Sequence, residues 1–424
     1  MSCHRAIFLV VLLLVTATMS LLGGCNPDDE IVAPVGLAPR KVSAEPSTSL
    51  DQRLVDGNMA FGFRILQALL EKGEHHNNIF ISPTSISIAL AMTANGADGD
   101  TFREIMETLQ LPEMDLDEFN GAFADLQSVL RNSDPEVELN VANSLWARQG
   151  VSLNEQFLQR NQDYFAAAFD TLDFEKPGAA SAINRWVEQQ TRGKIKKIIE
   201  RPIDPQTFLF LINALYFNGA WSNEFDPQNT REIPFTLPDG TGKDHPVMFR
   251  EGVYHYFQGN DFEAIRLPYG KNRRVGMTVF LPAVGSSLAE FCRKIEPENW
   301  AEWQLSFKKM EGEIGLPRFQ FEYDIALKEI LKKMGMESAF EPQRADFSKM
   351  ITALPGPYIS EVKHKTYIDV DEKGTEAAAV TSVECESTSV EVDRFNMIVD
   401  RPFFFTIIDE KTGVILFIGA VSNP

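Results

Sequence analysis

The chain has 424 residues, of which 44% are hydrophobic, so it can bury a large core in one big domain or two ordinary ones. Its 60 acidic residues outnumber the 40 basic ones and give a net charge of -20. The strongest basic cluster, RGKIKK at 192–197, is short, so we expect no nucleic acid and no heparin among the partners.

The N-terminal residues 1–24 are typical of an export signal. His4 and Arg5 form a short basic start, Ala6–Leu22 is apolar or small, and LGGC ends the segment at Cys25. The pattern resembles a bacterial lipoprotein signal peptide, in which the cysteine is acylated and becomes the mature N-terminus. The alternative is a transmembrane anchor, which has no need of small residues leading into a cysteine.

Residues 25–50 are expected to form an extended, proline-rich tether. Asn26 after the cysteine resembles the sorting pattern of outer-membrane lipoproteins. The acidic DDE at 28–30 resembles a surface-export tag, and a merely solvated linker explains it equally well. We therefore expect an outer-membrane lipoprotein, either surface-exposed or periplasmic, whose only membrane contact is its lipid anchor.

Two helices are predicted at the start of the folded region. Apolar residues at helical spacing mark the first, which should end near Gly73: Leu54, Phe61, Ile65 and Leu69. In SPTSISIALAMTANG, Ser82 is the expected N-cap of the second helix and Pro83 lies in its first turn. This helix should stop at Gly96.

Strand-like runs dominate the second half of the chain. They are VELNVANSLWA from Val137, TFLFLINALYF from Thr207 and RVGMTVFLP from Arg274. At the C-terminus, RPFFFTIIDEKTGVILFIGAV predicts a hairpin with its turn at Gly413. The pattern indicates an α+β fold with large, mostly antiparallel sheets and no internal repeat.

Motifs for catalysis or cofactor binding are missing. No nucleophile elbow, zinc-protease motif, phosphate-binding loop or dinucleotide fingerprint occurs, so we expect neither an enzyme nor a cofactor. The adjacent His75 and His76 are typical of a polar loop, and a metal site is the alternative. The chain has four cysteines. Cys3 is expected to be removed with the signal peptide, and Cys25 is expected to be acylated. Cys292 is expected to be buried, and Cys385 lies in the segment described next.

The segment EKGTEAAAVTSVECESTSV, residues 372–390, is unusual because it follows the strand-like TYIDV yet contains no proline and no aromatic residue. Its odd positions from 375 to 389 are small or β-branched, and the charges from 375 onward fall on even positions: Glu376, Glu384 and Glu386. In a strand, alternate residues face opposite sides, so this segment could enter a sheet with one face buried. The alternative is a surface loop whose alternation is accidental.

DEKGTEAAA resembles the proximal hinge of the serpins, the serine-proteinase-inhibitor family. NIFISPTSISIALAMTANGA resembles the family's early Ser-Pro motif, INALYFNGAWSNEFD its Asn-and-Trp strand motif, and DRPFFFTI its sequence beyond the reactive loop. The likeness covers residues 51–424, with the reactive-centre loop at about 372–395.

The resemblance implies a monomeric suicide-substrate inhibitor with the serpin fold, in which helices pack around the sheets and the reactive-centre loop is exposed. A target proteinase would cleave the loop and form an acyl-enzyme. The freed loop would then enter the central sheet before water hydrolyses the ester. Serpin loop insertion is itself a standard example of strand addition and strain release.

The resemblance also assigns site residues. The hinge residues are Glu372, Gly374, Thr375, Ala377, Ala378 and Ala379. The shutter, a polar cluster where strands must part, comprises Ser82, Ser85, Asn213 and His364. The breach, where insertion begins, comprises Trp221 and Arg318, the latter as the basic partner of Glu372.

Family spacing counted from both sides places the reactive bond at Thr388–Ser389, with Ser387, Val390 and Cys385 as alternatives. A threonine before the bond suggests an elastase-like or broad-specificity serine proteinase, or a cysteine proteinase, as target. The acidic stretch from Gly99 lies where heparin-activated relatives are basic. The alternative functions are a non-inhibitory serpin that serves as carrier or scaffold, and a surface adhesin.

Overall fold

Two large β-sheets organise the part of the chain that the computed structural model describes, which comprises residues 50–74, 77–131, 134–200, 202–204, 207–351, 357–375 and 394–424. The strands of the six-stranded sheet are β2 (Val137–Arg148), β3 (Ala168–Leu172), β4 (Leu209–Ala220), β10 (Phe319–Ala326), β11 (Glu361–Asp371) and β12 (Gly374–Thr375). They lie in the order β10-β11-β12-β4-β2-β3.

The nine-stranded sheet follows the order β1-β15-β14-β8-β7-β6-β9-β13, with β5 paired to β6. Its strands are β1 (Ile79–Ile81), β5 (Thr230–Thr236), β6 (Gly242–Gln258), β7 (Phe262–Tyr269), β8 (Val275–Pro282), β9 (Lys308–Pro317), β13 (Phe395–Ile398), β14 (Phe403–Asp409) and β15 (Val414–Val421). Most pairings in both sheets are antiparallel, which confirms the expected α+β class.

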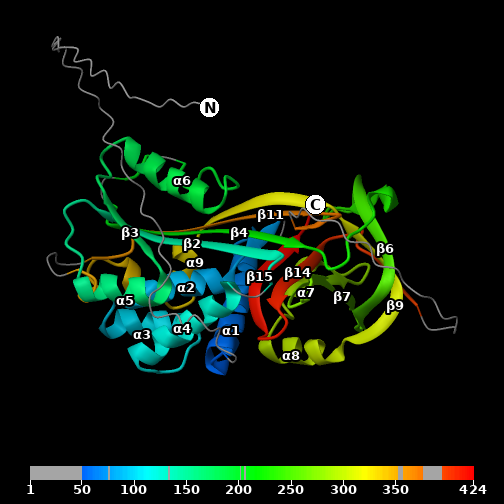
Figure 1. Ribbon diagram of the computed structural model, residues 1–424, viewed down its shortest axis with the longest axis horizontal. Helices are drawn as coiled ribbons and strands as arrows, with labels where there is room; N and C mark the ends of the chain where they lie inside the picture. Colours follow the sequence, from blue (N-terminus) through cyan, green and yellow to red (C-terminus); the bar gives the residue numbers. More distant parts are fainter. Residues whose placement is uncertain are drawn as a thin grey trace, which may run out of the picture. The chain divides into compact units, whose positions relative to one another are not determined.

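Helices cover both faces of the six-stranded sheet (Figure 1). Their bounds are α1 (Gln52–Glu71), α2 (Pro83–Ala94), α3 (Gly99–Thr108), α4 (Leu116–Arg131), α5 (Glu155–Phe165), α6 (Gly178–Gln190), α7 (Leu288–Cys292), α8 (Pro297–Ser306) and α9 (Lys328–Lys333), with short 3₁₀ turns at Pro227–Asn229 and Ser338–Phe340. In Figure 1, α6 lies on one face, and α2 to α5 lie on the other. None of the helices in the described ranges is long and apolar enough to cross a membrane.

The predicted second helix is α2, and every one of its residues is buried. Ser82 caps it by accepting a hydrogen bond from the Ser85 backbone N–H, and Pro83 occupies the first turn, where its missing N–H costs nothing. The first predicted helix is α1, which ends at Glu71. The predicted C-terminal hairpin is β14 and β15, joined by a turn in which Gly413 has φ +76°.

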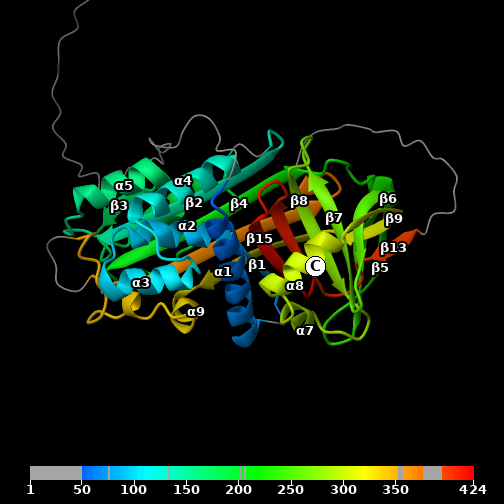
Figure 2. The ribbon, with the colours of Figure 1, turned by 90° about the horizontal axis from the view of Figure 1, so that it is seen from below.

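Two apolar clusters lie on opposite sides of β4. Leu211 and Leu215 belong to the large cluster that also contains α1 and α2, whereas Phe210 and Ile212 belong to a smaller cluster under α6. Because alternate strand residues face opposite sides, this near-continuous apolar strand is buried on both faces. Figure 2 shows β4 and β11 side by side through the middle of the molecule, which agrees with their pairing.

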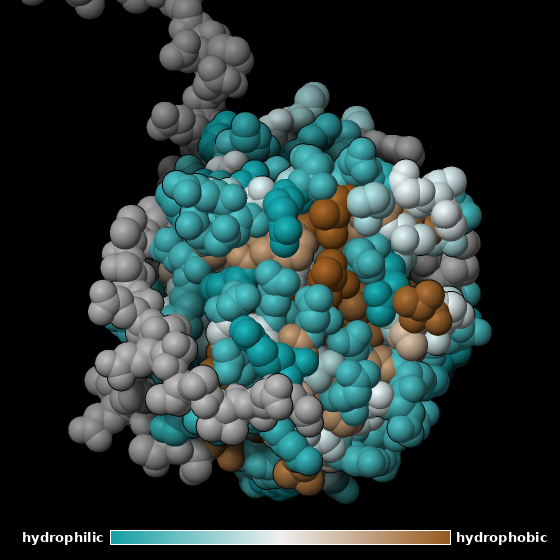
Figure 3. Space-filling model, turned by 90° about the vertical axis from the view of Figure 1, so that its right-hand side faces the viewer, coloured by the Kyte–Doolittle hydropathy of each residue, from teal (hydrophilic) through white to brown (hydrophobic). Residues whose placement is uncertain are grey.

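The face that carries β6 and β9 is mostly hydrophilic, with small, separate apolar patches (Figure 3). Val253 on β6 is one of its exposed apolar residues, with 68% of its surface accessible. Scattered single apolar residues of this kind are normal on protein surfaces and need no partner.

Candidate functional site

The chain reverses direction at the end of β11 and returns into the sheet as β12. The side chain of Asp371 stabilises this turn, because its Oδ1 accepts hydrogen bonds from the backbone N–H of Lys373 (2.8 Å) and Gly374 (3.2 Å). Gly374 has φ +150°, and a Cβ atom there would lie 2.2 Å from the carbonyl oxygen of Gly219. Only glycine allows this close approach of the two strands.

β12 parts the two central strands at one end of the sheet. Thr375 pairs with Val370 of β11 on one side and with Gly219 of β4 on the other, both antiparallel. Farther along, β11 and β4 pair directly with each other in parallel, from Glu361 to Tyr367. The sheet is therefore opened by a short wedge at one end and closed along the rest of the β11–β4 seam.

The side chain of Thr375 is completely buried. Its hydroxyl shares a hydrogen bond of 2.7 Å with the Tyr269 hydroxyl, whose pKa is raised by burial. The Tyr269 ring stacks on Trp221 with 4.3 Å between ring centres, and the Trp221 indole N–H donates to the carbonyl of Asp371 (3.0 Å). Trp221, assigned to the breach from sequence, thus packs against the hinge turn.

This arrangement corrects one expectation. The exposed loop was expected to begin at about residue 372, but Glu372 is only 5% exposed and Thr375 is fully buried. The reason is the set of specific contacts that hold the turn in the sheet, which alternation of residue type alone does not reveal. Any exposed part of the loop therefore begins after Thr375.

Glu372 is held by Arg318 and Thr230. Arg318 donates from Nε (2.8 Å) and Nη2 (2.5 Å) to Oε1 of the carboxylate, and the Thr230 hydroxyl donates to the same oxygen. Burial alone would raise the pKa of the Glu372 carboxyl, but the hydrogen bonds from Arg318 and Thr230 outweigh it and lower that pKa. The hinge carboxylate is therefore ionised and anchored at neutral pH.

Replacing Arg318 by glutamine should lower the stability of the uncleaved protein, because it leaves a buried carboxylate without its cation. We expect a loss of about 1–2 kcal/mol, less than for a fully buried pair, since the Arg318 side chain is 44% exposed. Urea unfolding measures the change, with Arg318→Lys as the charge-retaining control. An unchanged midpoint in Arg318→Gln would show that the pair does not hold the hinge.

A row of polar side chains crosses the closed part of the seam. His364 of β11 lies opposite Asn213 of β4 in the parallel register, and its Nδ1 hydrogen-bonds to Asn213 Oδ1. The other ring nitrogen, Nε2, accepts from the Ser82 backbone N–H (3.3 Å). Asn213 Nδ2 in turn donates to the Ser85 hydroxyl and to Asn143 Oδ1. The structure thus brings together all four residues assigned to the shutter.

These contacts determine the state of the buried imidazole. A backbone N–H can only donate, so Nε2 of His364 carries no proton and Nδ1 donates to Asn213. Burial lowers the pKa of His364 to about 3, which agrees with a neutral ring. Protonation would remove the acceptor of the Ser82 N–H and place a charge in the seam.

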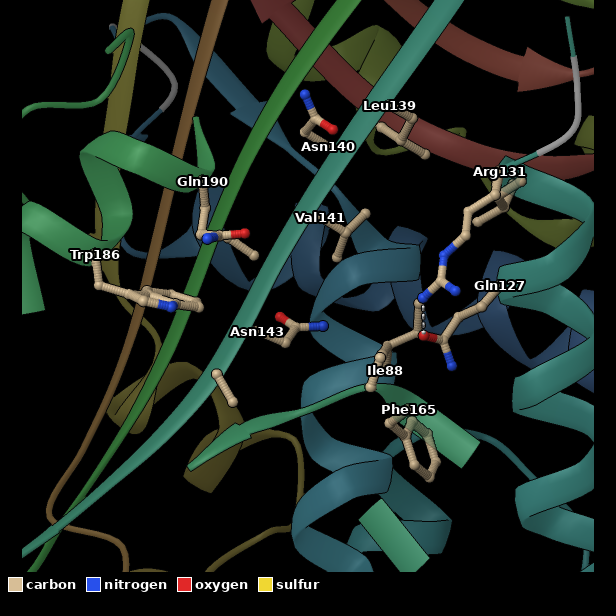
Figure 4. A pocket seen from close by; sticks show the side chains of 14 residues that line it. Ile88, Gln127, Arg131, Leu139, Asn140, Val141, Asn143, Phe165, Trp186 and Gln190 are labelled. Atoms are coloured by element: carbon tan, nitrogen blue, oxygen red, sulfur yellow. Dashed lines mark hydrogen bonds between the residues drawn. The ribbon is translucent and has the colours of Figure 1, made fainter. Parts of the chain in front are cut away.

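Asn143 of β2 extends the row and was not predicted. It lies directly opposite Asn213 in the β2–β4 register. The available signal was weak, because Asn143 is one of several polar residues in the strand-like run VELNVANSLWA. Asn143 also lines a cavity of about 380 Å³ at the outer edge of β2, between α4 and α6, where Figure 4 places it near Ile88.

The outer face of the seam is closed by the segment that follows α6. Lys365, only 6% exposed, donates from Nζ to the carbonyl of Lys197 (2.9 Å) and forms an ion pair with Glu322 (2.9 Å). The ammonium of Lys194 lies 5.6 Å from the centre of the Tyr367 ring. A strand that enters between β11 and β4 must therefore pass beneath this segment.

Several predicted residues lie outside the described residues: the reactive bond Thr388–Ser389, the lipid-attachment Cys25, Cys385, His75 and His76, and the hinge residues Ala377, Ala378 and Ala379. Cys292 is fully buried, as expected, and burial raises the pKa of its thiol. In the described ranges no group of three or more His, Cys, Asp or Glu residues is placed to hold a metal ion.

The chain is similar to known proteins over almost its whole folded region. The family model "Serpin (serine protease inhibitor)" matches residues 56–424. Antithrombin-III of Mus musculus is 33% identical over 380 residues, which are 88% of this chain and 82% of the relative. The uncharacterized serpin-like protein TK1782 of Thermococcus kodakarensis is 34% identical over 97% of this chain and 98% of its own length.

The fold agrees with this similarity. The native-state crystal structure of tengpin, a thermophilic serpin, superposes with a TM-score of 0.82 at 31% identity and covers 92% of this chain and 99% of tengpin. The family is described as one of serine protease inhibitors, and its members are not enzymes. The chain belongs to the serpin family.

Proposed function

We propose that the chain is a suicide-substrate inhibitor of serine proteinases that traps the acyl-enzyme by moving its cleaved loop into the six-stranded sheet. The observation that carries this proposal is β12. Two residues of the hinge, Gly374 and Thr375, already occupy the place between β11 and β4 that an inserted strand would fill. Insertion then extends the existing pairing of β12 with β11 and β4, and no new strand pairing has to be nucleated.

The strand pattern gives insertion a driving force. Before insertion, β11 and β4 form a parallel pair, whose ladder is slightly less stable per residue than an antiparallel one. A strand that continues from β12 would be antiparallel to both neighbours. Each further residue would thus replace one parallel pairing by two antiparallel pairings. The uncharged odd positions beyond Thr375 are small enough to fill the inner face.

The chemistry belongs to the target enzyme. Its active-site serine would attack the carbonyl carbon of Thr388, an ester would form, and the peptide bond would break with the Ser389 amine leaving as the new N-terminus. Insertion of the loop would carry the esterified enzyme away before water attacks. About fifteen residues at roughly 3.3 Å each span about 50 Å.

The target should accept a small, β-branched residue before the cleaved bond. Thr388 favours elastase-like or broad-specificity serine proteinases, and cysteine proteinases form the second group to screen. An arginine-specific, trypsin-like enzyme is not expected to be trapped at this bond.

A screen of such proteinases for a covalent complex that survives SDS tests the proposal. Mass spectrometry of the released C-terminal peptide should give Ser389 as its first residue. Cleavage of the loop without any complex would support a non-inhibitory serpin. Absence of both cleavage and complex across the panel would favour the carrier, scaffold or adhesin alternatives.

We also propose that the protein is a bacterial outer-membrane lipoprotein anchored through Cys25. Replacing Cys25 by alanine should release the protein from the membrane fraction and leave inhibition unchanged, because the tether of residues 25–50 precedes the region that matches the family. Fractionation followed by a complex assay measures both effects. A Cys25→Ala protein that still sediments with membranes would contradict the lipid anchor.

A further inference from the structure

A cavity of about 400 Å³ beside β6, β7 and β9 collects positive charge in this acidic protein. Its lining includes the cationic side chains of Arg250, Arg266, Arg273 and Lys309, together with His255. Among its described lining residues, the single carboxylate is Glu410. A local excess of cations is notable in a chain whose net charge is -20.

Two of the arginines are held in fixed orientations. Arg250 lies with its guanidinium carbon 4.5 Å from the centre of the Phe225 ring, and its Nε donates to the Tyr254 hydroxyl (2.9 Å). Arg266 lies 4.2 Å from the centre of the Phe307 ring, and its Nη2 donates to the Gln304 side chain (2.6 Å). Aromatic stacking and hydrogen bonds therefore preorganise both cations.

The counter-charge in the cavity is incomplete. Glu410 approaches Arg266 only to 3.5 Å, and burial raises the pKa of the Glu410 carboxyl. The positive charge of the cavity also acts on His255. Burial makes the largest contribution to lowering the pKa of His255, and the neighbouring Arg266 and Lys309 lower it further. The described structure records no ion pair for Arg250, and its Nη1 is buried without a hydrogen-bond partner there.

We infer that this basic cavity binds a compact oxyanion that carries two or more negative charges, such as a phosphate group or a small polycarboxylate. Its volume suits a small molecule and not a polymer. Guanidinium and ammonium groups are the donors that proteins use for phosphate and carboxylate oxygens. The site adjoins the hinge through Phe225. The Phe225 ring stacks against the Arg250 guanidinium, and its backbone N–H donates to the carbonyl of Glu372 (2.8 Å).

Calorimetric titration of the full-length protein with inorganic phosphate tests the inference, at constant ionic strength set with chloride. We expect saturable binding at one site, and citrate in a parallel titration distinguishes polycarboxylates from phosphate. The double substitution Arg273→Gln and Lys309→Gln removes two exposed cations at small risk to folding. It should weaken binding at least about tenfold.

Arg103→Gln is the matched control, because Arg103 is an exposed arginine on α3 that does not line the cavity. It should leave the affinity for phosphate and citrate unchanged. Absence of saturable binding of both anions would overturn the inference. Equal binding by the double variant and the wild type would also overturn it, since the anion would then bind elsewhere.

Discussion

Replacing Thr375 by arginine should convert the protein from an inhibitor into a substrate that the target proteinase cleaves at the same bond. Thr375 is fully buried in the sheet, with its hydroxyl on Tyr269. An unpaired charge at this position costs at least several kcal/mol to bury. An arginine side chain cannot keep the buried place that Thr375 holds between β11 and β4, so the hinge of the variant must bury this charge before any later residue gains its pairings. Insertion therefore slows while acylation and ester hydrolysis do not.

The stoichiometry of inhibition measures the effect. We expect covalent complex to fall to near zero in Thr375→Arg while the initial cleavage rate stays similar to that of the wild type. Thr375→Ser is the matched control, since it keeps the hydroxyl that bonds to Tyr269. Glu376 belongs to the even positions, which are expected to face solvent, so Glu376→Arg should leave the stoichiometry of inhibition nearly unchanged. Complex formation by Thr375→Arg at the wild-type stoichiometry would refute insertion as the trapping step.

Acidification should weaken the native fold through His364. Its pKa in the folded protein is about 3, below the ordinary histidine value of 6.5, so the unfolded state binds more protons between these two pH values. The stability that the neutral ring contributes is complete above about pH 6.5 and is lost as the pH falls toward 3. Between pH 7.5 and pH 5 the loss is about 2 kcal/mol.

Urea unfolding at the two pH values measures this loss, and His364→Gln separates it from the titration of other groups. Glutamine can still donate to Asn213 and accept from Ser82 but cannot take up a proton in this range. The pH-dependent loss should therefore be about 2 kcal/mol smaller in the variant than in the wild type. The same pH dependence in both proteins would show that His364 is not the titrating group.

The sequence predicts the framework of this fold well where local pattern and burial agree. The helix α2 follows from its Ser82 cap and Pro83, and the hairpin of β14 and β15 follows from two apolar runs around a glycine turn. In these elements the local preference and the tertiary environment favour the same structure.

The hinge and the polar row could be predicted only in part. Family likeness identified His364 and Asn213 and also paired Arg318 with Glu372, as the structure shows. The early return of β12 into the sheet depends on two further contacts made at long range. These are the approach of Gly374 to Gly219 and the hydroxyl pair of Thr375 and Tyr269. Contacts between residues so far apart in the chain leave no periodic signal. The same is true of Asn143, whose role depends on its register with β4.

The thermal midpoint of the protein before and after cleavage of the loop tests loop insertion most directly. A non-target proteinase that cuts close to the Thr388–Ser389 bond frees the whole strand that follows β12 without trapping an enzyme. If the freed strand enters between β11 and β4, the antiparallel pairings gained should raise the midpoint by on the order of 10 °C or more. A cleaved protein that melts at the same temperature as the intact one would contradict insertion, and with it the proposed mechanism of inhibition.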